Sequence, residues 1–383
     1  MIQSDDSSLP RVTVIIDSFL HANAGTENQL AKIVSGLSGS ARIEVITLRK
    51  SPWLQANADA LGIKATLMPI DGVRRLRSYR TIYNLIKHLR DTRPQVVHTF
   101  FPIANVLGVV AARIANVPAI YSSRRDYGEW MTPRYLAATR LANRFVTAII
   151  ANSKRVADMT CTREHLSAAR VRVIHNGIDL TPFAELSRSV ATAHALAIPD
   201  QAPVIGLVAN YRPMKRHETL VRALPLVLRQ HPDAHVLFVG ANMTPEDIES
   251  RVRALSEHLG VAGRVHQVHA DGNVTDYLGI IDVGINCSEG EGLSNAIMEY
   301  MAAGIPVIAA DSGGNPDLVT HELNGLLFAL DDHEALADAI NALISAPELR
   351  RSLARKARQF VADEFSIPSM LNRFAVEYGI PIR

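Results

Sequence analysis

Residues 288–308 read SEGEGLSNAIMEYMAAGIPVI, and this stretch decides the fold class. A short aliphatic run at 283–285 precedes it and another at 306–309 closes it, and both have the composition of buried strands. Between them, Ser294 is a suitable N-cap for a helix that we expect over 294–303. A glycine-rich loop that leads from a strand into a helix and back to a strand is typical of the βαβ unit of a parallel sheet.

The same alternation fills the rest of the chain. We predict further strands at 12–16, 43–48, 96–99, 148–151, 203–209, 236–239 and 326–328. Helices are expected at 217–230 and 244–259, and an earlier helix begins at Thr26, which forms a capping box with Gln29. The pattern loosens over 181–201 and then restarts, so we expect two α/β halves, each a doubly wound parallel sheet. Ligands of such sheets bind at the carboxyl ends of the strands.

Composition narrows the class of protein. The chain has 40 Lys and Arg against 38 Asp and Glu, and a net charge of +2 argues against a dedicated nucleic-acid-binding protein. Cys161 and Cys287 are its only cysteines, which excludes a disulfide framework and a thiolate zinc cluster. Residues 1–6 lack an apolar core and no run reaches ~20 apolar residues, so we expect no signal peptide or membrane span and a cytoplasmic location.

The loop at the centre of residues 288–308 has the chemistry of a sugar-phosphate site. Gly290 and Gly292 let the backbone approach a ligand closely, and the amides of the following helix start attract a phosphate. Glu291 and Glu299 flank this anion site, and their carboxylates can accept hydrogen bonds from sugar hydroxyls. The alternative is a solvated loop glutamate and an ordinary helix glutamate. The glycines, the cap and the preceding strand favour the binding site.

This stretch resembles the E-x7-E signature of retaining glycosyltransferases of family 4. The matching positions are Glu291, Gly292, Glu299, Met301, Ala302, Gly304, Pro306, Val307 and Ile308. Residues 150–153, 174–179 and 365–366 are similar to further segments of that family and follow in the same order. The resemblance implies an α/β protein of the GT-B fold, with two Rossmann-like, doubly wound domains facing across a cleft.

The resemblance also implies a division of the chain. Residues 1–177 would form an N-terminal, acceptor-side domain, and residues 178–365 a C-terminal domain that binds a nucleotide-sugar. Residues 366–383 would form a terminal helix that crosses back and packs on the N-terminal domain.

Donor-site roles follow from the resemblance. Glu299 would bind the ribose and Glu291 the transferred sugar. Gly292, Leu293, Ser294, Asn210 and Gly25 would complete the donor site. Lys215 matches the family's phosphate-binding lysine, whereas Asn210 stands where the family usually has an arginine, so Arg212 is expected to supply the guanidinium. With Glu291, these two cations form the predicted catalytic set, because fixed cations stabilise a departing diphosphate. The chain lacks an Asp-x-Asp motif, so we expect neither a metal nor another cofactor.

Four residues of the first half are candidates for the acceptor side. The family pattern V-V-H-x-H is met at His98 but has Phe100 at the second histidine, which leaves the donor hexose open. A buried structural histidine is the alternative for His98. Arg124 and Arg125 follow the next expected strand and suit a phosphate or carboxylate, although a salt-bridged surface loop is the alternative.

A basic segment at 74–93 is a candidate membrane contact. It has seven cations against Asp91: Arg74, Arg75, Arg77, Arg80, Lys87, Arg90 and Arg93. Apolar residues at 82, 85, 86 and 89 recur at helical spacing, so this is a basic amphipathic helix. Such a helix can dock on an anionic membrane, and the alternative is a solvated face.

Together these features predict a retaining glycosyltransferase. It would move a sugar from a nucleotide-sugar, with a UDP-sugar expected first, to a glycan, lipid-linked or small-molecule acceptor in polysaccharide or glycoconjugate biosynthesis. We expect no nucleic-acid partner, and a location in the cytoplasm or at the inner face of the membrane. The alternatives are a sugar-nucleotide epimerase of the same fold and a non-catalytic sugar-nucleotide-binding subunit.

Overall fold

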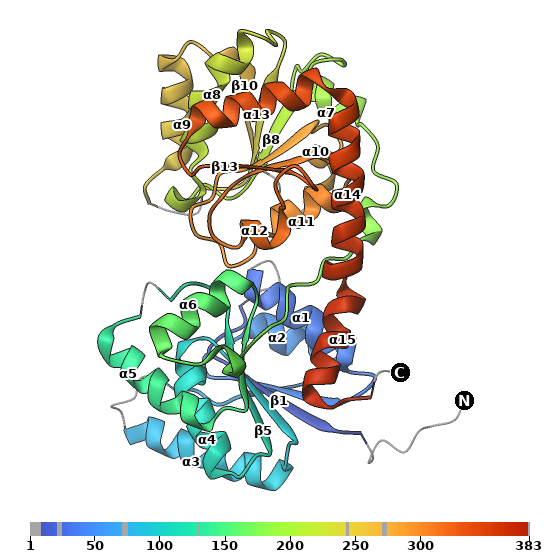
Figure 1. Ribbon diagram of the computed structural model, residues 1–383. Helices are drawn as coiled ribbons and strands as arrows, with labels where there is room; N and C mark the ends of the chain where they lie inside the picture. The colour runs from blue at the N-terminus through green and yellow to red at the C-terminus, as the bar shows by residue number, and fades with distance from the viewer. Residues whose placement is uncertain are drawn as a thin grey trace, which may run out of the picture. The chain divides into compact units, whose positions relative to one another are not determined.

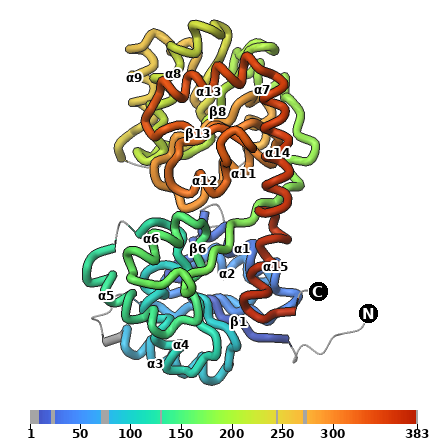
Figure 2. Tube along the Cα trace, viewed as in Figure 1, coloured from blue at the N-terminus to red at the C-terminus, as the bar shows by residue number. Residues whose placement is uncertain are grey.

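The structure is a computed structural model that describes residues 9–20, 25–70, 76–128, 131–242, 245–269 and 274–381. It divides into two compact units. Unit 1 comprises Met1–Gly177 with Ile367–Arg383, and unit 2 comprises Ile178–Ser366. Figures 1 and 2 show a sheet covered by helices in each unit.

Unit 1 contains a seven-stranded parallel sheet in the order β3-β2-β1-β4-β5-β6-β7. The register places Val14 of β1 between Val45 of β2 and His98 of β4. The strands are β1 Arg11–Ile16, β2 Arg42–Thr47, β3 Lys64–Leu67, β4 Val96–Phe100, β5 Ala119–Arg124, β6 Ala148–Ala151 and β7 Val171–Val173. The helices are α1 Gly25–Leu37, α2 Pro52–Asn57, α3 Leu76–Thr92, α4 Val109–Ile114, α5 Pro133–Ala142, α6 Lys154–Glu164 and α15 Ile367–Tyr378, with the short helices η2 Ala104–Gly108, η3 Asn143–Phe145 and η4 Ala168–Arg170.

Unit 2 contains a six-stranded parallel sheet in the order β10-β9-β8-β11-β12-β13. The strands are β8 Val204–Val208, β9 His235–Val239, β10 Val265–Val268, β11 Val283–Asn286, β12 Val307–Ala310 and β13 Leu326–Phe328. The helices are α7 Val190–Ala195, α8 His217–Leu228, α9 Ile248–His258, α10 Thr275–Leu278, α11 Asn295–Ala302, α12 Asn315–Leu318, α13 His333–Ser345 and α14 Pro347–Phe365, with the short helices η5 Thr181–Phe183, η6 Pro213–Lys215 and η7 Ala262–Arg264.

Both sheets confirm the predicted doubly wound α/β class. In each unit the strand order reverses beside the first strand, so β1 and β4 are neighbours in unit 1 and β8 and β11 are neighbours in unit 2. The central strands are buried on both faces because helices cover both sides, which explains their continuous aliphatic composition, whereas β3, β7 and β10 are partly exposed. Loops that leave two neighbouring strands at such a reversal form the usual ligand site of this architecture.

The helix predicted at the end of the chain forms as α15 and belongs to unit 1. Ser366 is extended between α14 and α15 and forms a bridge with Ile178 within unit 2. In unit 1, Phe374 is fully buried in the core of the sheet. A Cβ at Gly36 of α1 would lie 2.3 Å from Leu371, so this glycine allows α1 and α15 to approach closely.

Several local predictions differ from the structure. The first helix begins at Gly25, so Thr26 is not an N-cap, and the Gln29 side chain pairs with the Gly177 peptide instead of closing a capping box. The helix predicted over 244–259 begins at Ile248, with Asp247 as its cap. β3, β7 and β10 were not predicted, since each is a short edge strand with few aliphatic residues.

Candidate active site

Two loops of unit 2 meet at its strand-order reversal. One loop leaves β8 and carries residues 209–216, and the other leaves β11 and carries residues 287–294. The Glu289 amide donates to the Met214 carbonyl at 2.9 Å, and Arg216 forms an ion pair with Glu289. These contacts hold the two predicted motifs of unit 2 against each other.

Lys215 and Glu291 meet between these loops. The Lys215 ammonium contacts Oε1 of Glu291, and their side chains are only 18% and 14% exposed. Burial alone would raise the pKa of Glu291, but the Lys215 charge and hydrogen bonds from Lys215, Ser288 and Asn286 outweigh it and lower that pKa. The structure therefore brings together a predicted phosphate-binding cation and a predicted sugar-binding carboxylate, and it keeps the carboxylate ionised.

Ser294 caps α11 as predicted. Its Oγ accepts a hydrogen bond from the Ile297 amide at 3.4 Å and another from Asn286 Nδ2 at 2.9 Å. Gly292 is partly exposed at the loop surface, whereas Leu293 is only 6% exposed and packs into the core of unit 2. The Leu293 side chain is therefore part of the core, and its role in the donor site stays a prediction.

Residues 299–305, the later part of the E-x7-E stretch, mainly stabilise the structure of unit 2. Glu299 lies on α11 and is partly buried. The neighbouring Tyr300 accepts a hydrogen bond from the Val208 amide at 2.7 Å and donates to the Gly206 carbonyl at 3.2 Å, which fixes α11 to β8. Gly304 has a φ of 71°, and the Ile305 amide bonds the Tyr300 carbonyl at 2.8 Å, so this glycine ends the helix.

Asn210 and Arg212 are both exposed in the loop after β8. The Asn210 side chain accepts a hydrogen bond from the Ala241 amide at 3.1 Å and so joins the loops after β8 and β9. Arg212 precedes η6, the short helix that carries Lys215. This shared loop is consistent with Arg212 as the guanidinium of the site, which stays a prediction.

His98 and Phe100 of unit 1 are buried rather than presented to an acceptor. His98 is fully buried, with Nδ1 2.5 Å from the Tyr378 hydroxyl and Nε2 2.8 Å from the Ser123 hydroxyl. Phe100 is 1% exposed and its ring lies 4.3 Å from the imidazole. Burial, with a smaller contribution from Arg125, lowers the pKa of His98 to about 3, so the ring is neutral. These contacts favour the alternative of a buried structural histidine, since the hydrogen bonds of His98 connect β4 to β5 and α15, and an acceptor role for either residue stays a prediction.

The two adjacent arginines have different environments. Arg124 belongs to β5 and is 4% exposed, and its guanidinium forms a two-point ion pair with Glu164 at 2.6 and 2.9 Å. This ion pair favours the salt-bridged alternative for Arg124, and its acceptor contact stays a prediction. Arg125 lies just after the strand, is partly buried and donates to Asn176 Oδ1 at 2.6 Å. Burial lowers the pKa of Arg125 to about 10, and it keeps its charge at neutral pH.

Two further predictions concern the N-terminal part of unit 1 and metals. Gly25 is exposed at the first turn of α1, and a Cβ there would meet nothing within 4 Å, while Ala24 of the same motif lies outside the described residues. Within the described ranges, no group of three or more His, Cys, Asp or Glu side chains is arranged to hold a metal ion. The helices in those ranges also include none with the length and hydropathy needed to cross a membrane.

Sequence reasoning missed the polar residues that support Glu291. Asn286, Ser288 and Asn315 are 4%, 2% and 1% exposed, and they join the ends of β11 and β12 to the loop. The available signal was the pair of polar residues Asn286 and Ser288 at the end of β11. Asn315 had no signal, because it lies 29 residues after its hydrogen-bond partner Asn286 and meets it only through the β12 crossover.

Comparison with known proteins gives a consistent result. The family profile described as "Glycosyl transferases group 1" matches residues 192–360, and the one described as "Glycosyltransferase Family 4" matches residues 24–182. A GDP-mannose-dependent alpha-mannosyltransferase of Mycolicibacterium smegmatis is 28% identical over 379 residues, covering 92% of this chain and 95% of that protein.

Two further relatives extend this comparison. A UDP-Gal:alpha-D-GlcNAc-diphosphoundecaprenol alpha-1,3-galactosyltransferase of Escherichia coli is 22% identical over 78% of each chain. The crystal structure of HepE from Anabaena in complex with UDP superposes with a TM-score of 0.84 at 20% identity, covering 96% of this chain and 99% of that chain.

Proposed function

Because this chain belongs to glycosyltransferase family 4 and has the GT-B fold, we propose that it transfers a sugar, with retention of configuration, from a donor held by unit 2. It is a nucleotide-sugar-dependent glycosyltransferase. The observation that carries the proposed site is the contact of Lys215 with Glu291 between the two loops at the strand-order reversal.

Lys215 and Arg212 would bind the diphosphate of the donor. A departing nucleoside diphosphate gains negative charge, so a fixed ammonium and the amides at the start of α11 would lower the barrier without a metal ion. Glu291 would accept a hydrogen bond from the transferred sugar, and Glu299 would bind the ribose. The low pKa of Glu291 supports this role, since an ionised carboxylate is the stronger acceptor.

The donor is a UDP-sugar or a GDP-sugar. The sequence favoured UDP, whereas the Mycolicibacterium relative that spans nearly the whole chain is named for GDP-mannose. A panel of both donor classes, with release of the nucleoside diphosphate as the readout and EDTA present or absent, separates them. Activity that EDTA abolishes would refute the metal-independent mechanism.

The acceptor carries an anionic group near Arg125. Arg125 forms no ion pair with a carboxylate among the described residues, and its guanidinium donates to the neutral Asn176 side chain at 2.6 Å. A partly buried cation of this kind at the carboxyl end of β5 suits a phosphate or carboxylate. Arg125→Gln should raise KM for a phosphorylated acceptor and leave donor hydrolysis unchanged.

A basic face of unit 1 is a suitable contact for an anionic membrane. Residues 76–147 contain eleven Lys and Arg but three Asp and Glu, although the whole chain is nearly neutral. On α3, Tyr79 and Tyr83 are 61% and 66% exposed, and Lys87 and Arg90 are exposed on the same helix. Arg74 and Arg75 lie outside the described residues, as does the side chain of Arg77.

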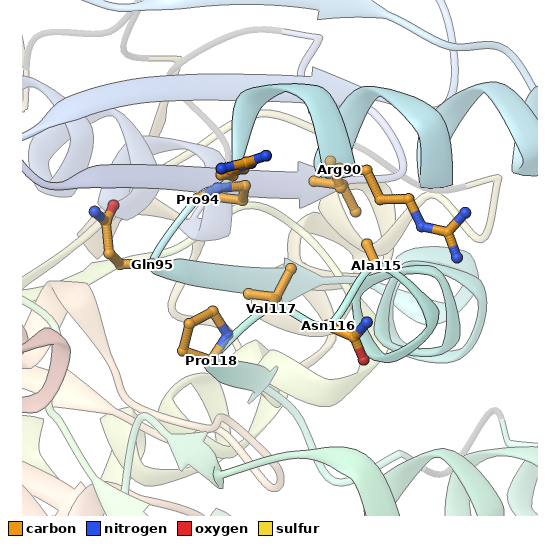
Figure 3. A pocket seen from close by; sticks show the side chains of 9 residues that line it. Arg90, Pro94, Gln95, Ala115, Asn116, Val117 and Pro118 are labelled. Atoms are coloured by element: carbon orange, nitrogen blue, oxygen red, sulfur yellow. The ribbon is translucent and has the colours of Figure 1, made fainter.

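A hollow of about 540 Å³ adjoins this face (Figure 3). Arg90 and Asn116 line it, and Arg90 also donates to the Ile114 carbonyl at 3.2 Å. Tyrosine beside cations is typical of surfaces at lipid headgroup level, and each cation contributes about 1 kcal/mol. Sedimentation with vesicles that contain anionic phospholipid should fall after Lys87→Gln with Arg90→Gln, and equal binding to neutral vesicles would refute this contact.

Two other functions remain as outcomes of the donor panel. Inversion of a free UDP-sugar at C2 would indicate an epimerase. Tight nucleotide-sugar binding without transfer to any acceptor would indicate a non-catalytic subunit.

A further inference from the structure

A network of buried polar side chains connects Glu291 to the core of unit 2. Its members are Asn286, Ser288, Ser294 and Asn315, each at most 4% exposed. Buried polar groups are costly unless they are hydrogen-bonded, so four of them beside one carboxylate need a reason beyond packing.

Ser288 contacts Glu291 directly. The Ser288 hydroxyl donates to Oε1 of Glu291 at 2.6 Å, and this is the same oxygen that Lys215 contacts. Asn286 supports this contact from behind, because its Oδ1 accepts a hydrogen bond from the Ser288 amide at 3.0 Å. The carboxylate is therefore held from two sides, by a cation from the β8 loop and by the neutral Ser288 hydroxyl from its own loop.

Asn286 is itself fixed on all sides. Its Oδ1 accepts hydrogen bonds from the Ser288 amide at 3.0 Å and from Asn315 Nδ2 at 3.2 Å, and its Nδ2 donates to Ser294 Oγ at 2.9 Å. Ser294 in turn caps α11. The orientation of Glu291 is thus tied to the start of α11 and to the start of α12, both of which are regular secondary structure.

From this geometry we infer that Ser288 and Asn286 are positioning residues, which keep Glu291 oriented and ionised when Lys215 turns to the diphosphate. The inference rests on the proposed function, in which Lys215 serves two partners. Once the ammonium moves, burial would favour a protonated Glu291, and the protonated acid is a weaker acceptor for a sugar hydroxyl. The Ser288 hydroxyl, a neutral donor held in place by Asn286, prevents this change.

The test compares Ser288→Ala with Ser312→Ala. Ser312 is a matched control because its hydroxyl bonds the Glu289 carbonyl of the same loop but does not contact Glu291. We expect Ser288→Ala to lower kcat/KM about tenfold, the effect of losing one hydrogen bond to a charged group. The acid limb of the rate profile should move to higher pH, and affinity for the free nucleoside diphosphate should stay within about twofold. Ser312→Ala should change none of the three.

A second measurement does not depend on turnover. The carboxyl carbon of Glu291, followed by NMR in the unliganded protein, should titrate at higher pH in Ser288→Ala than in the wild type. Ser288→Cys keeps the shape with a weaker donor and should give an intermediate midpoint. Equal midpoints and equal rate profiles in Ser288→Ala and Ser312→Ala would overturn the inference, whereas a wild type that transfers no sugar from any donor overturns the proposed function instead.

Discussion

Replacing Lys215 by Met tests the proposed site most directly. The substitution keeps a long flexible side chain and removes only the charge and its hydrogen bonds. Loss of one group that stabilises developing charge typically costs ~10²–10³ in rate, so we expect kcat/KM to fall by that factor. The affinity for a nucleotide-sugar should fall as well, because the diphosphate loses a cation.

The same substitution has a consequence for stability. Glu291 is 14% exposed and would lose its cation but keep Ser288 and Asn286, so we expect a cost of about 1–3 kcal/mol rather than that of an isolated buried charge. For a unit of this size each kcal/mol corresponds to about 2–4 °C in Tm.

The pH dependence of this cost has a definite sign. The pKa of Glu291 is lowered from 4.5 in the folded protein, so its contribution is present at neutral pH and is lost as the pH falls through the folded pKa. The gap in Tm between wild type and Lys215→Met should be widest near pH 7 and should close in acid, below the usual pKa of a glutamate.

The assay pairs donor turnover with thermal unfolding across pH. Lys154→Met is the control, since Lys154 is 76% exposed and pairs with Asp158 on the surface of α6. Its Tm and turnover should match those of the wild type. Normal turnover by Lys215→Met, or a gap in Tm that does not vary with pH, would refute the assignment of Lys215 and the coupling to Glu291.

Three further changes have expected outcomes. His98→Gln should make the free energy of unfolding less dependent on pH in acid, as measured by urea unfolding at several pH values. In the wild type, His98 is buried and neutral with a pKa of about 3, so the free energy of unfolding falls by up to about 1.4 kcal/mol per pH unit below pH 6.5. Glu164→Gln should destabilise unit 1 by about 3–5 kcal/mol in the same assay, because it leaves Arg124 buried without its carboxylate, and an unchanged unfolding midpoint would contradict that pairing. Gly284→Ala should destabilise unit 2 by about 1–3 kcal/mol, since its Cβ would lie 2.5 Å from the ring of Tyr300, and a wild-type Tm would show that the ring can move aside.

The sequence predicted the fold class because its signals are local. The cap at Ser294 and the aliphatic run before residue 288 depend on neighbouring residues, and both formed as expected. The capping box at Gln29 failed because its side chain found the Gly177 peptide, 148 positions away, and no local pattern reports such a partner. The conformation of the Gln29 side chain was therefore determined by a long-range hydrogen bond rather than by its neighbours in sequence.

The residues of the candidate site were predictable from local motifs, but their contacts were not. Lys215 and Glu291 were each assigned from a motif, but their contact depends on β8 and β11 being neighbours, which only the strand order determines. Arg124 and Arg125 are adjacent in sequence, yet one ends a strand and turns inward while the other follows it. Successive side chains of a strand point to opposite faces. Arg124, the last residue of β5, is therefore a structural arginine inside unit 1, whereas Arg125, one position later, is a candidate ligand contact.

The placement of α15 in unit 1 affects how the chain folds during synthesis. Unit 2 is one continuous segment, but the core of unit 1 takes Met370, Phe374 and Tyr378 from the far side of that segment. About 190 residues of unit 2 must therefore be synthesised after the sheet of unit 1 and before α15 can pack against that sheet. Until then the sheet exposes an apolar surface, so early termination before residue 367 should yield a chain whose second unit folds and whose first unit aggregates.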